Sequence, residues 1–298
     1  MHEIDRVRDA IRATPRGVLV TIVRAHGSTY RRAGARAVIA EDGRATGAIS
    51  GGCLERDLAE RIRPWLAEMQ PRLVTYDSTR TDDLVFGLGL GCRGILELLI
   101  EPFDAAHPPR LLNFAWNGRE PVEWTTRLPD GDTLVELIPP ERAIVVFGGG
   151  PDVEPVLVLA RQTGWRADAV TTRDPVDVTA YDAAVVMTHN FERDVEALRA
   201  LLASRIRYIG ILGPRSRGDE LLAKLGASRD SRIFSPVGLD LGAETPEEIA
   251  LSIVSEIQAV LSASSARSLR ESTTAIHELE DKRGDGLQPV AMFDIATG

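Results

Sequence analysis

The chain has 298 residues, 44% of them hydrophobic and 27% charged, which is the composition of one large or two ordinary folded domains and excludes a disordered chain. Its formal net charge is −9 and it has two cysteines, which argues against a nucleic-acid-binding protein and against a disulfide framework. No apolar run reaches the length of a membrane helix and the charged, amphipathic start lacks a secretory h-region, so we expect a cytoplasmic protein without a membrane partner.

The first hundred residues mix helices and strands. Apolar residues at helical spacing predict a short helix at the start, and the β-branched run "GVLVTIVRA" (residues 17–25) predicts a buried strand. A polar loop follows, then a strand near residues 36–40, an Asp-Gly turn and another strand. Further strands are expected from "RLVTYD" (72–77) and "GILELLIEP" (94–102). We predict an N-terminal α+β domain over residues 1–104.

The stretch "AISGGCLERD" (48–57) places Gly51 and Gly52 directly before Cys53, where an amphipathic helix begins. Glycine permits left-handed backbone and close approach of a ligand. A cysteine at a helix start lies near N–H groups and the helix dipole, which favour a thiolate. A small buried residue after an ordinary turn is the structural alternative, because free cysteines are among the most buried residues.

Residues 105–141 lose the periodic pattern and contain linker-like and hairpin-like sequence. From residue 142, short strands alternate with helical patterns, the last of which opens with the capping box "TPEE". Such alternation predicts a Rossmann-like doubly wound parallel sheet over residues 142–263, followed by a polar C-terminal tail over 264–298. The expected fold class is therefore α/β, with the α+β domain preceding the parallel sheet.

"VVFGGGPDVEP" (145–155) has the strand, glycine turn and helix start that bind phosphate in such sheets. Gly148 and Gly150 fit the dinucleotide pattern, but Val153 stands at its third glycine and no acid ends the following strand at the expected place; Asp174 comes a few residues late. Nucleotide binding and a phosphate-binding architecture without a working site both stay open.

Three later strand ends carry candidate ligand contacts. His189 could form a proton-transfer or ligand-contacting pair with Asp194, although a helix cap explains the same spacing. Arg215 could hold a phosphate, or lie on a solvated helix start, and Asp240 lies in a glycine-flanked loop. No G-x-S-x-G, Walker A or H-E-x-x-H motif is present.

Between about residues 18 and 257, seven segments follow one another in fixed order: "HGSTYRRAGARAVI", "GAISGGCLE", "GLGLGCRG", "VVFGGGPDV", "THNFERD", "YIGILGPRSR" and "PVGLDLGAETPEEIALSIVSEI". Together they resemble the XdhC/CoxI accessory proteins of molybdenum hydroxylases such as xanthine dehydrogenase. This chain departs from the family pattern at Tyr30, Ser50, Arg93 and Val153.

The resemblance implies a maturation factor that binds the molybdenum cofactor (molybdopterin), protects it during sulfuration and delivers it to the apo-enzyme. It implies two partners, a molybdenum hydroxylase and a cysteine desulfurase, and we expect a homodimer. An NAD(P)-dependent oxidoreductase and a persulfide carrier acting through Cys53 are the alternatives. The expected cofactor-binding residues, with Cys53 also contacting the metal and no catalytic residue assigned, are Gly51, Gly52, Cys53, Glu55, Arg31, Gly148, Gly150, His189, Arg215 and Asp240.

The candidate residues form two glycine-rich groups, one around Cys53 with Arg31 and one around residues 148–150 with His189. The cofactor has an anionic phosphate at one end and a soft metal–sulfur centre at the other. The phosphate suits backbone N–H groups and arginine, and the metal centre suits a thiolate. We therefore expect both groups to contribute to cofactor binding, and NAD(P) binding to be weak or absent.

Overall fold

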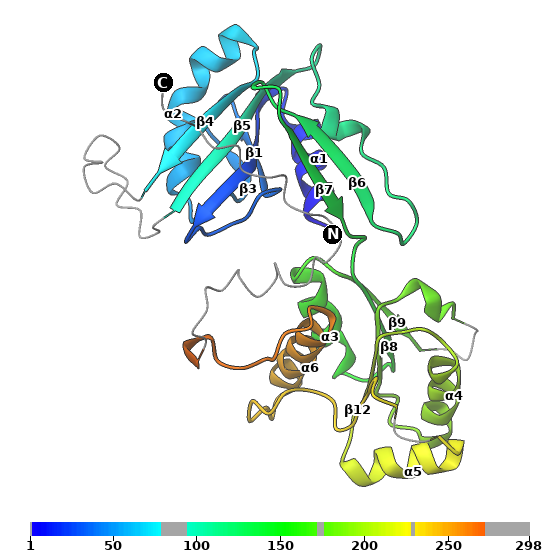
Figure 1. The fold of residues 1–298 in the computed structure, drawn as a ribbon. Helices are drawn as coiled ribbons and strands as arrows, with labels where there is room; N and C mark the ends of the chain where they lie inside the picture. Colours follow the sequence, from blue (N-terminus) through cyan, green and yellow to red (C-terminus); the bar gives the residue numbers. More distant parts are fainter. Residues whose placement is uncertain (1, 79–93, 172–175, 228–229, 272–298) are drawn as a thin grey trace. The chain divides into compact units, whose positions relative to one another are not determined.

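The computed structural model describes residues 2–78, 94–171, 176–227 and 230–271 (Figure 1). The chain divides into two compact units, Met1–Ser264 and Ser265–Gly298, and both five-stranded sheets belong to the first. In the second unit, the described residues contain the short 3₁₀ helix η3 (Leu269–Glu271). The second cysteine, Cys92, and the late acid Asp174 lie outside the described residues.

The first sheet is antiparallel throughout and has the strand order β3-β2-β1-β5-β4. The long central strand β1 forms because its β-branched apolar residues fit a pleated surface that is buried on both faces. The bounds of the strands are β1 (Arg16–Gly27), β2 (Arg36–Ala40), β3 (Ala45–Gly47), β4 (Arg72–Asp77) and β5 (Gly94–Asp104).

Two helices cover opposite faces of this sheet. Successive side chains of β1 point to opposite faces, so both faces are apolar and each is covered by a helix. Val18 and Val20 pack with the apolar stripe of α2 (Cys53–Glu68), whereas Leu19 packs with α1 (Glu3–Ala13) and the 3₁₀ helix η1 (Arg110–Asn113). The turn at Cys53 is thus held in place by the helix that follows it, because α2 packs its apolar face into the core.

The hairpin of β6 (Val122–Arg127) and β7 (Thr133–Ile138) adds to the core on the α1 side. Ile138 is buried with the residues of α1, and the buried Arg36 of β2 forms an ion pair with Glu136 of β7. Much of the segment predicted as linker and hairpin therefore packs onto the first sheet. The domain boundaries at residues 104 and 142 stay predictions.

The second sheet is parallel, with the order β12-β11-β10-β8-β9, and confirms the Rossmann-like fold class. Along β8, Ile144 and Val146 face helices α3 and α6, whereas Val145 and Phe147 face the side of α4 and α5. The bounds are β8 (Ala143–Phe147), α3 (Val153–Gln162), β9 (Arg166–Val170), η2 (Val178–Ala180), β10 (Ala183–Val186), α4 (Phe191–Leu202), β11 (Tyr208–Ile211), α5 (Arg215–Leu225), β12 (Ile233–Phe234) and α6 (Pro246–Leu261).

The strand order reverses between β8 and β10, which are neighbours in the sheet. The chain leaves β8 through α3 to reach β9 on one side, while β10, β11 and β12 continue on the other side. Such a switch point opens a crevice at the carboxyl ends of the two strands, where sheets of this type bind ligands. Within the described ranges, no helix is long and apolar enough to cross a membrane.

Candidate functional site

The turn that leads into α2 has an open face. We call residues 50–53 the Cys53 turn. Gly52 has φ 106°, which an L side chain rarely adopts, so glycine is required there by the backbone. Gly51 does not have a left-handed φ. Among the residues that the structure describes, a Cβ atom built at Gly51 or Gly52 would meet no heavy atom within 4 Å beyond its chain neighbours. The space over both glycines therefore permits a ligand to approach the backbone closely.

Ser50 and Glu55 hold the Cys53 turn together. The buried Glu55 carboxylate accepts hydrogen bonds from the Ile49 and Ser50 N–H groups at 2.8 and 2.9 Å, and from the Ser50 hydroxyl. The same hydroxyl oxygen accepts from the N–H groups of Gly52 (3.0 Å) and Leu54 (3.2 Å). The side chains of Ser50 and Glu55 thus fix the backbone on both sides of Cys53 through hydrogen bonds.

These contacts decide the ionisation of Glu55. Burial raises the pKa of its carboxyl, but the hydrogen bonds from Ser50 and Ile49 outweigh burial and hold the pKa below its usual value. Glu55 is an ionised brace for the turn, and the oxygens that make these bonds face backbone N–H groups. Direct contact of Glu55 with a cofactor stays a prediction.

Cys53 is the first residue of α2 and is half-buried, with Sγ 3.6 Å from Ser50 Oγ. The sequence predicts N–H groups near the thiol at the helix start. The structure shows that two N–H groups there, those of Gly52 and Leu54, already donate to Ser50. The Cys53 side chain packs partly against the core on the α2 side and lies beside Ser50, next in the chain to the open face of Gly51 and Gly52. Two amide groups beside it are already hydrogen-bonded.

Arg31, predicted to contact the cofactor, lies in the loop after β1. Its guanidinium donates to both carboxylate oxygens of Glu3 in α1, at 2.7 and 2.8 Å. Arg31 is still partly exposed, with 31% of its side chain accessible. An anion could reach Arg31 only in competition with the Glu3 carboxylate.

The second candidate group is the switch-point turn, which we define as residues 148–152, between β8 and α3. A Cβ atom on Gly148 would lie 2.6 Å from the carbonyl oxygen of Met187, so a side chain is excluded there. A Cβ atom on Gly150 would lie 2.5 Å from Oδ1 of Asp152 and 3.7 Å from the ring of His189. The structure thus brings Gly150 and His189, both predicted site residues, together at the switch point.

The partner of His189 is Asp152. His189 Nε2 lies 2.7 Å from Asp152 Oδ2, and the imidazole is 61% exposed. His189 also has φ 57°, a left-handed conformation that is costly for a side chain with a Cβ atom. The imidazole is therefore presented at the carboxyl end of β10 and oriented by an acid from the neighbouring turn.

The sequence-based pairing of His189 with Asp194 is corrected by this geometry. Asp194 is buried and accepts from the Thr188 hydroxyl at 2.5 Å and from Arg217 at 2.6 Å. Asn190 caps α4 as the structural alternative predicted. Asp194 and Arg217 therefore stabilise the end of β10, and Arg217 is committed to an ion pair.

Arg215 and Asp240 lie at the carboxyl ends of β11 and β12. Arg215 is exposed at the first position of α5. Asp240 is exposed in a loop that is held by Glu256, whose carboxylate accepts from the Gly238 N–H at 2.8 Å. Both residues are available to a ligand at this edge of the sheet, and their roles stay predictions.

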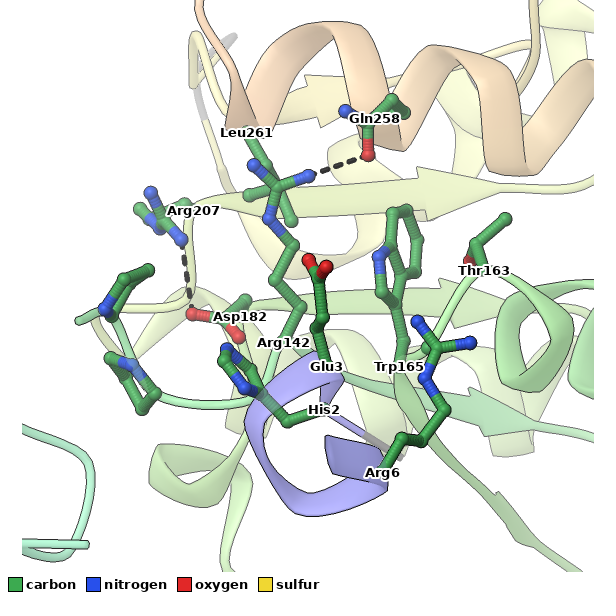
Figure 2. A pocket seen from close by; sticks show the side chains of 13 residues that line it. His2, Glu3, Arg6, Arg142, Thr163, Trp165, Asp182, Arg207, Gln258 and Leu261 are labelled. Carbon is green, nitrogen blue, oxygen red and sulfur yellow. Dashed lines mark hydrogen bonds and ion pairs between the residues drawn. The ribbon is translucent and has the colours of Figure 1, made fainter. Parts of the chain in front are cut away.

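A pocket of about 440 Å³ lies at the amino ends of the strands of the parallel sheet (Figure 2). Its lining includes Arg142, Trp165, Asp182 and Arg207, each of which directly precedes a strand. Figure 2 shows Arg207 paired with Asp182, and Asp182 also accepts from Arg119. Because ligands of doubly wound sheets bind at the carboxyl ends of the strands, we do not place the functional site in this pocket.

Two residues of the switch point were missed in the sequence. Asp152 lies inside the glycine motif, but only the fold shows that its carboxylate meets a histidine 37 positions later. Arg193 of α4 donates to the backbone carbonyl of Thr171, just after β9, and so adds a half-buried cation near the carboxyl ends of the same strands. In the described part of the chain, no group of three or more His, Cys, Asp or Glu residues could hold a metal ion.

Comparisons with known proteins agree with these two folds. A family model described as the XdhC Rossmann domain matches residues 144–257, and one described as the XdhC and CoxI family matches residues 10–77. A Bacillus halodurans protein whose crystal structure is described as a xanthine dehydrogenase is similar with a TM-score of 0.74 and 28% identity, over 92% of this chain and 98% of that chain.

Two curated relatives are similar over most of their length. The molybdenum cofactor insertion chaperone PaoD of Escherichia coli is 25% identical, over 85% of this chain and 86% of that protein. A Bacillus subtilis protein described as a probable xanthine dehydrogenase subunit is 32% identical, over 80% of this chain and 92% of that protein. With both sheets, both matched segments and these relatives in agreement, the chain belongs to the XdhC and CoxI family.

Proposed function

We propose that this protein binds the molybdenum cofactor, protects it while its terminal sulfur is installed, and delivers it to a molybdenum hydroxylase of the xanthine dehydrogenase type. The observation that carries the proposal is the Cys53 turn, a thiol beside two glycines whose outer face is open. The names of two relatives support it, since one is a molybdenum cofactor insertion chaperone and the other belongs by name to a probable xanthine dehydrogenase.

The chemistry of the Cys53 turn fits a metal–sulfur cargo. A thiolate is a soft ligand that suits a molybdenum–sulfur centre better than oxygen ligands do. The open face over Gly51 and Gly52 permits a bulky, flat group to approach the backbone. Because Cys53 is the sulfur ligand this turn offers, the cofactor would bring its other metal ligands with it, among them the two sulfurs of its dithiolene.

The protein acts in this proposal as an assembly factor without turnover of its own. Its partners are the apo-hydroxylase that receives the cofactor and a cysteine desulfurase that supplies sulfur, and it works in the cytoplasm. The acids and histidine of the switch point serve binding, and no residue is assigned a catalytic step. Assembly as a homodimer stays a prediction.

The test compares Cys53→Ala with the unaltered protein after expression in a host that makes molybdopterin. Oxidation converts bound molybdopterin to a fluorescent product, so fluorescence after removal of unbound material measures cofactor retention. We expect Cys53→Ala to fold normally and to lose about tenfold or more in retention, the effect of one lost contact worth roughly 1.4 kcal/mol. Activation of a co-expressed apo-hydroxylase is expected to fall in parallel.

Cys92→Ala is the matched control, because it removes the other cysteine and we expect it to matter less. Equal cofactor content and equal hydroxylase activation in Cys53→Ala and the unaltered protein would reject the proposed role of the thiol. Persulfide on purified Cys53, detected by mass in the absence of bound molybdopterin, would favour the sulfur-carrier alternative instead.

A further inference from the structure

The pocket shown in Figure 2 is separate from both candidate sites, since none of the described residues that line it belongs to the Cys53 turn or to the switch-point turn. Its walls come from the start of α1, the residues that precede four strands of the parallel sheet, and the last turn of α6. Its volume of about 440 Å³ is in the range of sites for small organic ligands. The cations that line it are Arg6, Arg142 and Arg207.

Arg142 is held in this pocket without an acid as its partner. The side chain is half-buried, and Cζ lies 5.8 Å from the centre of the Trp165 ring. The guanidinium donates to the neutral side-chain oxygens of Gln258 (2.5 Å) and Ser262 (3.0 Å), and it forms no ion pair within the described ranges. Burial, and next the charge of Arg207, lower the pKa of Arg142, but a guanidinium stays charged at pH 7. An anion in the pocket would relieve this cost.

Two carboxylates also line the pocket, and both already have arginine partners. Glu3 accepts from the Arg31 guanidinium with both of its oxygens, at 2.7 and 2.8 Å. Asp182 accepts from Arg207 at 3.0 Å and also from Arg119. Two carboxylates thus serve three guanidinium groups, and neither is left to neutralise the other cations of the pocket.

The pocket therefore has a surplus of positive charge. Arg6 is exposed and, like Arg142, forms no ion pair in the part of the chain that the structure describes. Burial lowers the pKa of His2, so its imidazole adds no charge at pH 7. The carboxyl ends of α3 and α6 contribute to the walls, and their dipoles together supply about one negative charge. With the guanidinium groups that the two carboxylates leave unbalanced, about two positive charges remain.

We infer that this pocket binds an organic phosphate, a phosphomonoester with a small apolar or ring-containing remainder. A phosphomonoester carries about two negative charges at pH 7, and guanidinium groups hold its oxygens by charge-assisted hydrogen bonds. The volume leaves room beyond the phosphate group, against an apolar wall formed by Pro139, Pro140 and Leu261. This second site does not depend on the proposed function, and it lies at the ends of the strands opposite to the switch-point turn.

The experiment titrates the full-length protein by isothermal calorimetry with phenyl phosphate, phenyl sulfate and inorganic phosphate. Phenyl sulfate has nearly the shape of phenyl phosphate but a single negative charge, and inorganic phosphate lacks the ring. We expect one phenyl phosphate per chain, bound about tenfold or more tightly than phenyl sulfate, because the second charge meets guanidinium groups in a partly buried site. Inorganic phosphate should bind more weakly than phenyl phosphate, because it does not bury an apolar surface.

Arg6→Gln and Arg207→Gln should each weaken the binding of phenyl phosphate by about tenfold. Both side chains are exposed, so both variants should fold like the unaltered protein by circular dichroism. Arg199→Gln is the matched control, because Arg199 is an exposed arginine of α4 outside the lining of the pocket, and it should leave the affinity unchanged.

The inference is wrong if phenyl phosphate shows no saturable binding, if phenyl sulfate binds equally well, or if Arg199→Gln weakens binding as much as the two pocket variants do. Retention of molybdopterin, itself a phosphomonoester, is measured in Arg6→Gln to identify the source of the phosphate. A fall in retention would assign the pocket to the phosphate of the cofactor, whereas unchanged retention would assign it to a separate organic phosphate. If the unaltered protein binds phenyl phosphate but no molybdopterin, the inference stands and the proposed function fails.

Discussion

Glu55 shows how a buried acid shapes the turn that leads into a helix, here the turn that carries the candidate ligand Cys53. Its carboxylate is surrounded by three donors from Ile49 and Ser50, which keep it ionised in spite of its burial. Ser50 links Glu55 to the backbone of the turn, because the hydroxyl that donates to Glu55 also accepts from the N–H groups of Gly52 and Leu54. The position of the Cys53 thiol therefore depends on an acid two residues further along the helix.

We expect Glu55→Gln to lower the free energy of unfolding by roughly 1.5–3 kcal/mol at pH 7, the usual value for hydrogen bonds to a charged group. Because the folded-state pKa of Glu55 is depressed, its contribution is complete above its unfolded value of about 4.3 and is lost as the pH falls through the folded-state pKa. The difference between the two proteins should accordingly shrink below about pH 4.

Urea unfolding at pH 7, 5 and 3.5 checks this, with Glu60→Gln as the control, since Glu60 is an exposed acid on the same helix. A constant difference across the three pH values would show that Glu55 stabilises the turn by packing and not by its charge.

At the scale of elements, the sequence was most informative where one segment determines its own structure. Helix α6 begins at Pro246 as predicted, because the capping box between Thr245 and Glu248 is complete within four residues. The sequence pattern predicts the helix before it over Asp219–Leu225, whereas α5 begins four residues earlier, at Arg215. Its first turn, "RSRG", has no apolar residue, so no hydrophobic period marks it.

Contacts between distant elements were not predictable in the same way. Asp152 and His189 are brought together because β8 and β10 are neighbours in the sheet. A single sequence does not reveal that its strands pair in this way. The ion pair of Arg36 with Glu136 spans 100 residues and ties a hairpin to β2. Sequence patterns therefore predicted both sheets and the two glycine groups, but not the partners of the polar residues within them.

The loop after β12 is held by such a distant contact, and it carries the next prediction. Tyr208 in β11 is buried and its hydroxyl donates to Glu256 of α6 at 2.5 Å, while the same carboxylate oxygen accepts from the Gly238 N–H. Burial, and next the Glu256 charge, raise the pKa of Tyr208 well above its usual value. Tyr208→Phe should lower the free energy of unfolding by about 1 kcal/mol and increase hydrogen exchange at Gly238.

Tyr181→Phe is the control, because it removes a half-buried hydroxyl that bonds to Asp168 on the same sheet, far along the chain from the loop. Unchanged exchange at Gly238 in Tyr208→Phe, with normal exchange elsewhere, would show that Gly238 is held by Glu256 alone.

For the molecule as a whole, the parallel sheet has the architecture of a nucleotide-binding domain, but its turn between β8 and α3 departs from the dinucleotide pattern. Val153 fills the third glycine position and is buried, while Asp152 and Pro151 replace phosphate-binding groups. The same fold can thus serve a different ligand, since function resides in the residues of the site.

We therefore expect NADH and NADPH to bind with dissociation constants no tighter than about 1 mM, equivalent to roughly −4 kcal/mol. Isothermal calorimetry on the full-length protein measures this directly. Asp152→Gly, which removes the acid from the turn, should bind either nucleotide more tightly than the unaltered protein does. Stoichiometric micromolar binding to the unaltered protein would instead favour the oxidoreductase alternative.

The hydrogen bonds that the Cys53 turn makes within itself have a consequence for the release of the cofactor in the proposed function. Since Ser50 already satisfies the amides of Gly52 and Leu54, a bound cofactor has neither to order this loop nor to complete its hydrogen bonds. Attachment then depends on a few contacts, each of which changes affinity by only about tenfold per 1.4 kcal/mol. In the proposed function, a client enzyme that surrounds the same cofactor with two or three more bonds would outcompete the turn without any input of energy, and transfer would run in one direction by affinity alone.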